Sequence, residues 1–500
     1  MTKDSQKLFN RPGYISLQDY VEDIQEMKRY GPWKLPLGSL DYLHFLFLSF
    51  VLKISWFKDI LYIYHTSKIS PSYKIIFSFL EKNLFFDSMS EGDLHCRGFF
   101  SYHLQKTITI KDRSWVIIGQ GVSENRDIAL SKALGEIVER MVSGLYDMNR
   151  KIINESVLDL VKKYQVVYPP KYHRFLDIQK NKQKSLNHLS SEKIPWVEGY
   201  NLITKEKTYI PRQITSWFDQ NYKTKHYFIN PTTNGAAGYF TKDGAILRGL
   251  LEVVQRDAFF VHWLTTTAPH IIEQETLPEK IKERIKNFEL LGISLYLLDV
   301  TDIPIPSVFI VATNSQSKVP QIVLTGASSL TFEEAINDGL REMVMACEMF
   351  FYKNSEIESK YEKNEPEPFI SNIGKIGRQL YWKGEIRVKE FNWFVSGAKV
   401  SYNELCKQNL LSEDDDSNKL KKCLEVLGKL DIGYHPVVYF PENKIQKQLG
   451  FYIAQVFIPK AFPLYLVEKH GTFDSDRLEE FALSKNNKEW KLNTLPHMFS

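Results

Sequence analysis

Two segments of the chain each place carboxylate or amide side chains three residues apart, directly before an arginine. The members are Glu136, Glu139 and Arg140 in the first segment and Glu252, Gln255 and Arg256 in the second. On a helix, positions i and i+3 share a face, so each segment would present oxygen ligands beside a guanidinium. Mg²⁺ prefers such oxygens, and arginine binds phosphate through two parallel hydrogen bonds. The segments are therefore candidates for a magnesium and phosphate site, although one isolated copy is also typical of a solvated helix face with local ion pairs.

The composition is that of a folded, globular chain, with 43% hydrophobic and 25% charged residues among 500. The 64 basic and 60 acidic residues give a net charge of +4, too small in so long a chain to indicate nucleic acid binding as its main function. The four cysteines show no Cys-x-x-Cys spacing, so we expect neither a structural zinc site nor a disulfide framework. The polar segment 1–12 lacks the apolar core of a secretion signal, and a cytoplasmic protein is predicted.

The first ninety residues form a separate, aromatic-rich segment that is predicted to be mainly helical, with a boundary at the polar cluster 87–93. Within it, 42–52 is almost wholly apolar and hydrophobicity continues to Tyr64. Charged residues interrupt this stretch, and its clean part is too short to span a bilayer. We predict a buried or partner-facing helix there and no membrane span.

Beyond this boundary the pattern is that of an α/β protein. Strands are predicted at 106–111 and 114–118, followed by a turn at 119–121 into a helix over 124–146. A loop at 230–238 is dense in turn-forming residues and opens a second helix over 242–263. Further strands are expected at 196–202, 208–210, 294–300, 307–313, 321–324 and 450–459, a helix at 331–352, and loops at 179–193, 354–368 and 413–418.

In combination these marks resemble the YcaO family. The resemblance is carried by the helix 129–140, the loop 234–238, and the helix 249–258 with Trp263 beyond it, and it extends roughly from Leu94 to the C-terminus. It implies an α/β enzyme of YcaO-type fold, with mixed sheets and flanking helices, that binds ATP and Mg²⁺ through glutamates of two helices. No Gly-x-x-x-x-Gly-Lys-Ser/Thr loop occurs in the chain. The expected organisation is a helical segment at 1–90, an ATP-binding domain at 91–480 and a tail at 481–500.

The resemblance also implies roles for individual residues. The implied magnesium ligands are Glu136, Glu139, Glu252 and Gln255. The implied nucleotide contacts are Arg140, Asn234, Gly235, Gly238, Arg256 and Asp257, together with Gln120 and Lys132. Glu342 would complete the acidic pocket, and the tail, through Pro496 and His497, keeps part of a Pro-His-Pro pattern that reaches the active site in azoline-forming members. For each residue alone, a surface or helix-packing role is the alternative.

Four positions depart from the family pattern. Gln120 stands where a lysine is usual, Lys132 replaces a small serine, and Gly244 and Gln255 replace glutamates. A glutamine carbonyl still coordinates Mg²⁺ but carries no charge, so the metal should be held less tightly. We hypothesise that Lys132 restores the positive charge missing at Gln120.

The leading functional hypothesis is an ATP-dependent cyclodehydratase. It would activate backbone amides of a ribosomally made precursor peptide, so that Cys, Ser or Thr side chains close thiazoline or oxazoline rings. A separate leader-binding protein is the expected partner, docking on the N-terminal segment, and a flavin-dependent dehydrogenase would be a further one. The rival hypotheses are backbone thioamidation and a catalytically impaired scaffold.

Overall fold

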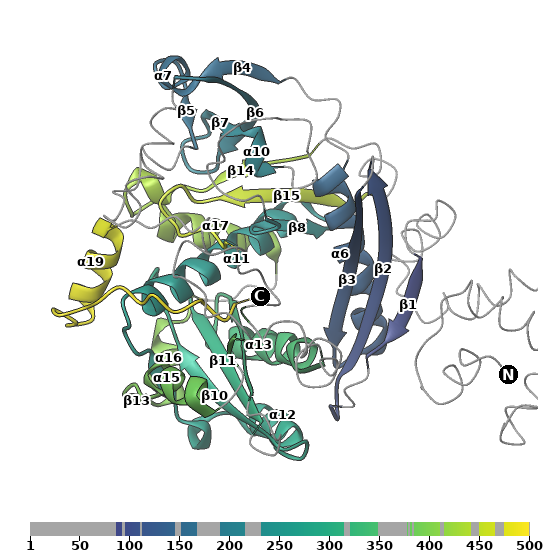
Figure 1. Ribbon diagram of the computed structural model, residues 1–500, viewed down its shortest axis with the longest axis vertical. Coiled ribbons are helices and arrows are strands. Elements are labelled where there is room, and N and C mark those ends of the chain that lie inside the picture. The colour runs from purple at the N-terminus through teal and green to yellow at the C-terminus, as the bar shows by residue number, and fades with distance from the viewer. Residues whose placement is uncertain are drawn as a thin grey trace, which may run out of the picture. The chain divides into compact units, whose positions relative to one another are not determined.

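The computed structural model describes most of the chain beyond Asp87 (Figure 1). The described ranges are 87–92, 96–110, 113–145, 152–167, 191–215, 232–314, 321–348, 378, 381–382, 385–410, 415–441, 450–465 and 475–499. The chain divides into two compact units, Met1–Arg140 and Met141–Ser500. Residues 1–86 of the predicted helical segment 1–90, the apolar stretch 42–64 and most of the predicted loops lie outside the described residues. The described end of that segment is a strand, Ser88–Glu91, and not a helix.

In the first unit, three antiparallel strands form a sheet in the order β1 (Ser88–Glu91), β2 (Phe100–Ile110) and β3 (Arg113–Ser123), followed by helix α6 (Arg126–Leu145). The turn predicted at 119–121 is wrong, because β3 runs straight through it. A Cβ atom on Gly121 would lie 2.1 Å from Ala129 O, and one on Gly119 would lie 2.5 Å from Ala133 O. The glycines therefore serve the close approach of α6 to the strand and not a change of chain direction.

The second unit contains two sheets. The larger has the order β5-β7-β6-β14-β15-β8, with β4 also paired to β6. Its strands are β4 (Ile153–Ser156), β5 (Gln165–Val166), β6 (Lys193–Asn201), β7 (Lys207–Pro211), β8 (Ala236–Tyr239), β14 (Val437–Tyr439) and β15 (Tyr452–Phe457). The strands predicted at 196–202, 208–210 and 450–459 are confirmed. The predicted loop 230–238 is partly wrong, since its last three residues begin β8.

The smaller sheet of the second unit has the order β12-β11-β10-β9-β13. Its strands are β9 (His270–Ile272), β10 (Ile293–Asp299), β11 (Ser307–Asn314), β12 (Gln321–Ser328) and β13 (Lys399–Val400). Neighbours are antiparallel except β9 and β13. The strands β10, β11 and β12 were predicted, and the short strands β9 and β13 were missed because so few residues carry no periodicity.

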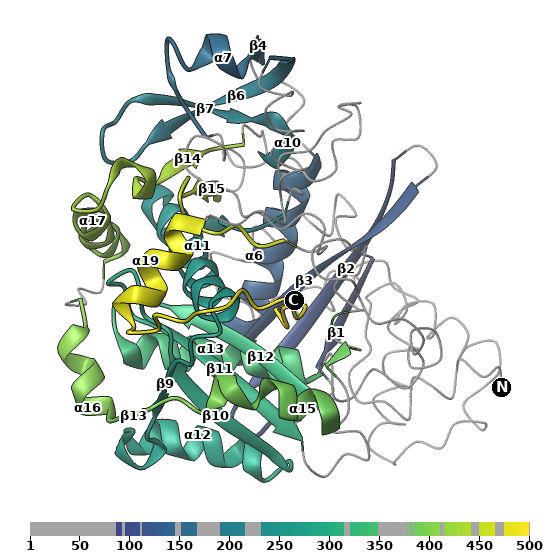
Figure 2. The ribbon, with the colours of Figure 1, turned by 60° about the vertical axis from the view of Figure 1, so that its left-hand side comes forward.

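Helix α11 (Lys242–Leu264) lies between the two sheets of the second unit (Figures 1 and 2). It begins after Thr241, whose side chain accepts a hydrogen bond from Gly244 N, the usual N-cap arrangement. Its first half packs with β8 and β15, and its second half packs with β11 and β12. Because apolar residues occur all round α11, nearly the whole helix is buried.

The remaining helices of the second unit flank these layers. α13 (Phe332–Cys347) covers β11 and β12, α12 (Glu279–Glu289) packs on β10, and both α17 (Asp416–Leu427) and α19 (Ser475–Ser484) pack on α11. Shorter helices are α7 (Val157–Leu160), α10 (Arg212–Thr215), α15 (Glu385–Phe391) and α16 (Tyr402–Leu405). The helices predicted near 242–263 and 331–352 are confirmed. In the described part of the chain, no helix is long and apolar enough to cross a membrane.

Candidate functional site

In the first unit, Glu136 of α6 is held between an arginine and a backbone N–H group. Its Oε2 accepts a hydrogen bond of 2.5 Å from Gln120 N, and its Oε1 forms an ion pair with Arg140. Arg140 in turn donates to Ile118 O at 2.5 Å. The pair has i,i+4 spacing, and Glu139 lies half-buried on the same helix.

In the second unit, Glu252 of α11 repeats this arrangement. Its Oε2 accepts a hydrogen bond of 3.0 Å from Gly235 N, and its Oε1 lies 2.9 Å from Arg256 Nη2. The two groups therefore share one design, a glutamate that receives a backbone N–H group and pairs with the arginine four residues later. A carboxylate has about four lone-pair positions, so two such contacts orient it and leave it able to bind a cation.

Gly235 can reach Glu252 because two glycines bring the loop against the helix. Gly235 has φ of +76°, and a Cβ there would lie 2.1 Å from Val456 O. A Cβ on Gly249 would lie 2.3 Å from Gly235 O. Only glycine meets both requirements, a left-handed backbone and direct contact between loop and helix. The neighbouring Asn234 has a buried Oδ1 atom without a hydrogen-bond partner, and Gly238 lies in β8, paired with Ile453.

Arg256 lies at the centre of the second group. Its guanidinium carbon lies 3.7 Å from the centre of the Phe499 ring, and its Nε is buried without an acceptor. Burial lowers the pKa of Arg256, and the negative charges of Glu252 and Glu342 oppose this change. Glu342 of α13 is thus near enough to act electrostatically on Arg256. The structure brings together Glu252, Arg256, Gly235 and Glu342, four of the residues predicted from the sequence.

Two other predicted residues of α11 have contacts of a different kind. Gln255 is buried, and its amide nitrogen donates to Gly326 O in β12, so its orientation is set by the sheet. Asp257 is fully buried, with Oδ1 accepting a 2.9 Å bond from Phe462 N and Oδ2 paired at 2.7 Å with Arg477 Nη2. Both oxygens of Asp257 are engaged within the protein, which gives it a role in packing. The role of Asp257 as a nucleotide contact stays a prediction.

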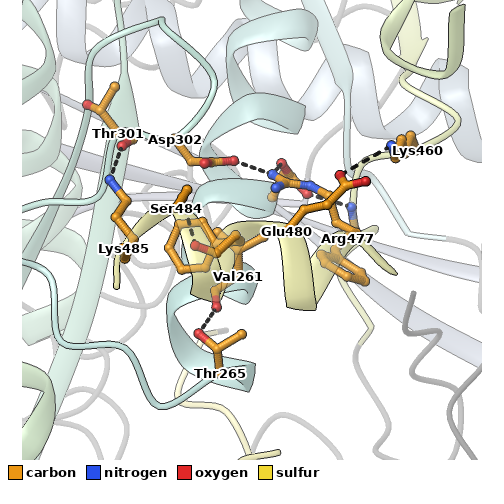
Figure 3. Close-up of polar contacts among 12 residues, drawn as sticks. Val261, Thr265, Thr301, Asp302, Lys460, Arg477, Glu480, Ser484 and Lys485 are labelled. Atoms are coloured by element: carbon orange, nitrogen blue, oxygen red, sulfur yellow. Dashed lines mark hydrogen bonds and ion pairs between the residues drawn. The ribbon is translucent and has the colours of Figure 1, made fainter. Parts of the chain in front are cut away.

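Arg477 connects Asp257 to a third segment. It also forms an ion pair with Asp302, and Figure 3 shows these two side chains pointing toward each other beside α19. Burial disfavours the charged guanidinium, but the carboxylates of Asp257 and Asp302 outweigh it, so the pKa of Arg477 is raised. This buried network fixes α19, from which the chain continues to its C-terminal residues.

The structure shows the surroundings of the positions that depart from the family pattern. The Gln120 amide nitrogen lies 3.0 Å from His103 Nδ1, and Lys132 is exposed on α6. A Cβ on Gly244 would lie 2.2 Å from Tyr239 Cδ1 and 2.6 Å from Asp416 Oδ2. A glutamate at position 244 therefore requires these neighbours to move.

The oxygen donors of the second group suit Mg²⁺. Among the described residues, no three His, Cys, Asp or Glu side chains lie close enough together to hold a metal ion alone. Mg²⁺ does not require such a cage, because it keeps several waters and binds through one or two carboxylates plus substrate phosphates. The Glu252 carboxylate and the partnerless Asn234 Oδ1 are hard oxygen donors of this kind, and Arg256 supplies a phosphate-binding group.

Comparison with known families identifies the family to which the chain belongs. The model of the YcaO cyclodehydratases, described as ATP- and Mg²⁺-binding, matches residues 119–461, which is more than half of the chain. The chain belongs to the YcaO cyclodehydratase family. Both glutamate–arginine groups and the Gly235 loop fall within the matched residues, and ATP and Mg²⁺ are the cofactors of this family. No curated protein matches the chain in a sequence search.

Solved structures show the same YcaO fold. A heterocyclase in complex with substrate and cofactor is 15% identical, with a TM-score of 0.63, over 83% of this chain and 55% of its own. YcaO from Methanopyrus kandleri, bound with AMPPCP and Mg²⁺, is 16% identical, with a TM-score of 0.58, over 81% of this chain and 94% of its own. The E. coli microcin synthetase McbBCD complex with pro-MccB17 bound is 12% identical, with a TM-score of 0.50, over 82% of this chain and 96% of its own. The chain thus spans about half the length of the first of these proteins.

The C-terminal residues that the structure describes in this YcaO chain contact the second group, and the sequence predicted only part of this contact. Pro496, in the partial Pro-His motif of the tail, was predicted as a site residue, and this stays a prediction. In the structure the ring of Phe499 lies on Arg256. Trp382 Nε1 donates to Pro496 O at 2.9 Å, so Pro496 contributes through its backbone. The only signal for Phe499 was an apolar pair, Met498 and Phe499, after a polar segment.

Proposed function

We propose that the chain is an ATP-dependent cyclodehydratase that acts in the cytoplasm on a ribosomally made precursor peptide. The observation that carries the proposal is the Glu252 carboxylate, held by Gly235 N and Arg256 in a family that binds ATP and Mg²⁺. The peptide's Cys, Ser or Thr side chain would add to the preceding amide carbonyl, and loss of the amide oxygen would leave a thiazoline or oxazoline. The heterocyclase with bound substrate and the microcin synthetase with bound pro-MccB17 support a peptide substrate.

The chain's own residues have distinct parts in this proposal. ATP and Mg²⁺, when bound, supply the phosphoryl group that turns the amide oxygen into a leaving group and the charge that stabilises its transfer. Arg256 and Arg140 bind phosphate oxygens, and Gly235 and Gly238 allow a close backbone approach beside Asn234. Gln120, Lys132 and Glu342 complete the set of polar contacts. The proposed metal ligands are Glu136, Glu139 and Glu252, with Gln255 contributing through its uncharged oxygen.

A leader-binding protein encoded separately is the proposed partner. The microcin synthetase neighbour is a complex of several proteins, which supports a division of labour between subunits. A flavin-dependent dehydrogenase that oxidises the azoline ring would act after the reaction proposed here.

The contacts of Gln255 and Gly244 favour a second candidate, a catalytically impaired scaffold. The Gln255 amide is directed at Gly326 O, and the space beside Gly244 is taken by Tyr239 and Asp416. Two positions that hold carboxylates in other members are therefore built into the packing here. Such a protein would bind peptide or partner without turning over ATP.

Magnesium-dependent ATP turnover in the presence of precursor peptide and partner distinguishes these functions. We expect turnover, and a loss of one water per modified residue by mass spectrometry, whereas thioamidation would exchange oxygen for sulfur. Glu252→Gln and Glu136→Gln should each lower turnover about 10- to 100-fold, because each removes charge from an oriented ligand. Glu279→Gln, at a carboxylate whose side chain is 90% exposed on α12, is the matched control and should leave turnover unchanged.

Two results would count against the proposal. Wild-type protein that binds the peptide but neither turns over ATP nor changes the peptide's mass would favour the scaffold. Normal turnover in both glutamate variants would show that the reaction uses other residues.

A further inference from the structure

The last described residues, 493–499, form a segment that is fixed along the second half of α11. We call it the C-terminal segment. Three hydrogen bonds tie its backbone to the protein: Asn493 N to Leu264 O at 2.8 Å, Trp263 Nε1 to Leu495 O at 3.3 Å, and Trp382 Nε1 to Pro496 O at 2.9 Å. Figure 2 shows the yellow chain leaving α19 and running back to α11 and α13. The segment is therefore an integral part of the core.

His497 anchors the segment from within. Its side chain is fully buried, with Nε2 2.9 Å from Tyr465 O and 3.0 Å from Arg378 Nη1. Burial, and next the charge of Arg378, lower the pKa of His497 well below its usual value, so the ring is neutral near pH 7. A neutral ring packed against Tyr465 and Phe260 keeps the following two residues in one place.

Phe499 ends this described segment on Arg256. The ring packs on Phe259 and Phe309, with centres 5.5 and 5.4 Å apart, and only 5% of the residue is exposed. Its face lies 3.7 Å from the Arg256 guanidinium carbon. One edge of the same guanidinium is bound to Glu252. The guanidinium plane is therefore fixed by a ring on its face and a carboxylate on its edge, which leaves its other donors for an anion.

We propose that Phe499 is a positioning residue for Arg256. By stacking on the guanidinium, it sets the plane in which Arg256 presents its N–H groups to the nucleotide phosphates. Cation–π contact favours this orientation and excludes water from that face. The inference rests on the proposed function of Arg256 as a phosphate contact and adds the residue that holds it in place.

The test is nucleotide affinity in variants of Phe499, measured by calorimetry with Mg²⁺ and a non-hydrolysable ATP analogue. Phe499→Leu keeps an apolar side chain but removes the aromatic face, so we expect the Kd to rise about tenfold. Phe499→Tyr keeps the face and should restore the Kd to within about twofold of wild type. In steady-state ATP turnover, Phe499→Leu should raise KM and change kcat little.

Phe394→Leu is the matched control. Phe394 belongs to the same aromatic cluster and packs on Phe259 and Trp263, so its loss should perturb the core to a similar extent. We expect similar decreases in melting temperature for Phe394→Leu and Phe499→Leu, with a raised Kd only for Phe499→Leu. Equal Kd values for these two variants, or no rescue by Phe499→Tyr, would overturn the inference.

An Arg256→Gln background separates this inference from the proposed function. If both hold, Arg256→Gln weakens nucleotide binding, and adding Phe499→Leu weakens it less than about twofold further, because the two side chains act as one unit. Full additivity of the two changes would refute the positioning role and leave the function intact. Unchanged binding in Arg256→Gln alone would refute the phosphate role itself.

Discussion

The histidines of α11 and the C-terminal segment show how single buried residues set the chain's response to acid. His262 is buried, its Nδ1 lies 2.9 Å from Thr267 O, and its Nε2 has no hydrogen-bond partner. Burial lowers the pKa of His262 from 6.5 to about 4. The unfolded chain takes up a proton near its ordinary pKa, whereas the folded chain resists it. The contribution of His262 to stability is therefore complete above pH 6.5 and falls as the pH drops toward 4.

We predict that His262→Asn reduces this acid sensitivity. Asparagine can keep the hydrogen bond to Thr267 O but does not titrate. At each pH, the free energy of unfolding of the variant is subtracted from that of wild type. This difference should be about 1.4 kcal/mol smaller at about pH 5.5 than at about pH 8. Urea denaturation at the two pH values measures it, and a difference that does not change with pH would contradict the assignment. His497 titrates in the same direction, so the variant keeps part of the wild-type response.

At the scale of elements, the contact between the Gly235 loop and α11 is the feature on which the second glutamate group depends. Gly249→Ala would place a Cβ 2.3 Å from Gly235 O, a backbone atom that cannot turn aside. We expect a loss of about 1–3 kcal/mol in free energy of unfolding, even though alanine gains about 1 kcal/mol in helix propensity. Nucleotide affinity should fall as well, because Gly235 N would no longer reach Glu252.

Gly339→Ala in α13 is the control for this change. Its Cβ would meet Ile310 Cδ1 at 3.1 Å, the movable end of a side chain. Its free energy of unfolding should stay within about 1 kcal/mol of wild type, with unchanged nucleotide affinity. Equal effects of the two substitutions would show that the loop tolerates displacement. Thermal unfolding and calorimetry with Mg²⁺ and an ATP analogue provide both values.

Elements with a long, regular apolar pattern could be predicted from the sequence, whereas the structural role of individual glycines could not. α11 and the central strands β10 and β11 follow apolar periodicity, which is a local property. Gly119 and Gly121 instead sit within β3, because α6 lies too close for any side chain. That requirement depends on a neighbour elsewhere in the chain. The same limit applied to the site, where Glu252 and Arg256 could be named but the stacking of Phe499 on Arg256 joins residues more than two hundred positions apart.

At the scale of the whole molecule, Arg477 joins three distant segments of the second unit. Arg477→Met would leave the fully buried Asp257 and the partly buried Asp302 without their cation. We predict a loss of about 3 kcal/mol in free energy of unfolding, since an uncompensated buried charge is strongly destabilising. Arg248→Met is the control, because Arg248 is 40% exposed and pairs with Asp416 near the surface, so about 1 kcal/mol or less should be lost. Similar losses in the two variants by chemical denaturation would show that the network contributes little.

Helix α11 packs with both sheets of the second unit, β8 and β15 on one side and β11 and β12 on the other. Residues of Ala245–Val254 belong to an apolar cluster that includes residues of β15. Residues of Ala258–Leu264 belong to another, which includes residues of β11 and β12. Neither sheet can keep its core if the helix moves away, so opening at α11 exposes both cores at once. The two sheets, which share no described strand, are in this way made into a single cooperative folding unit.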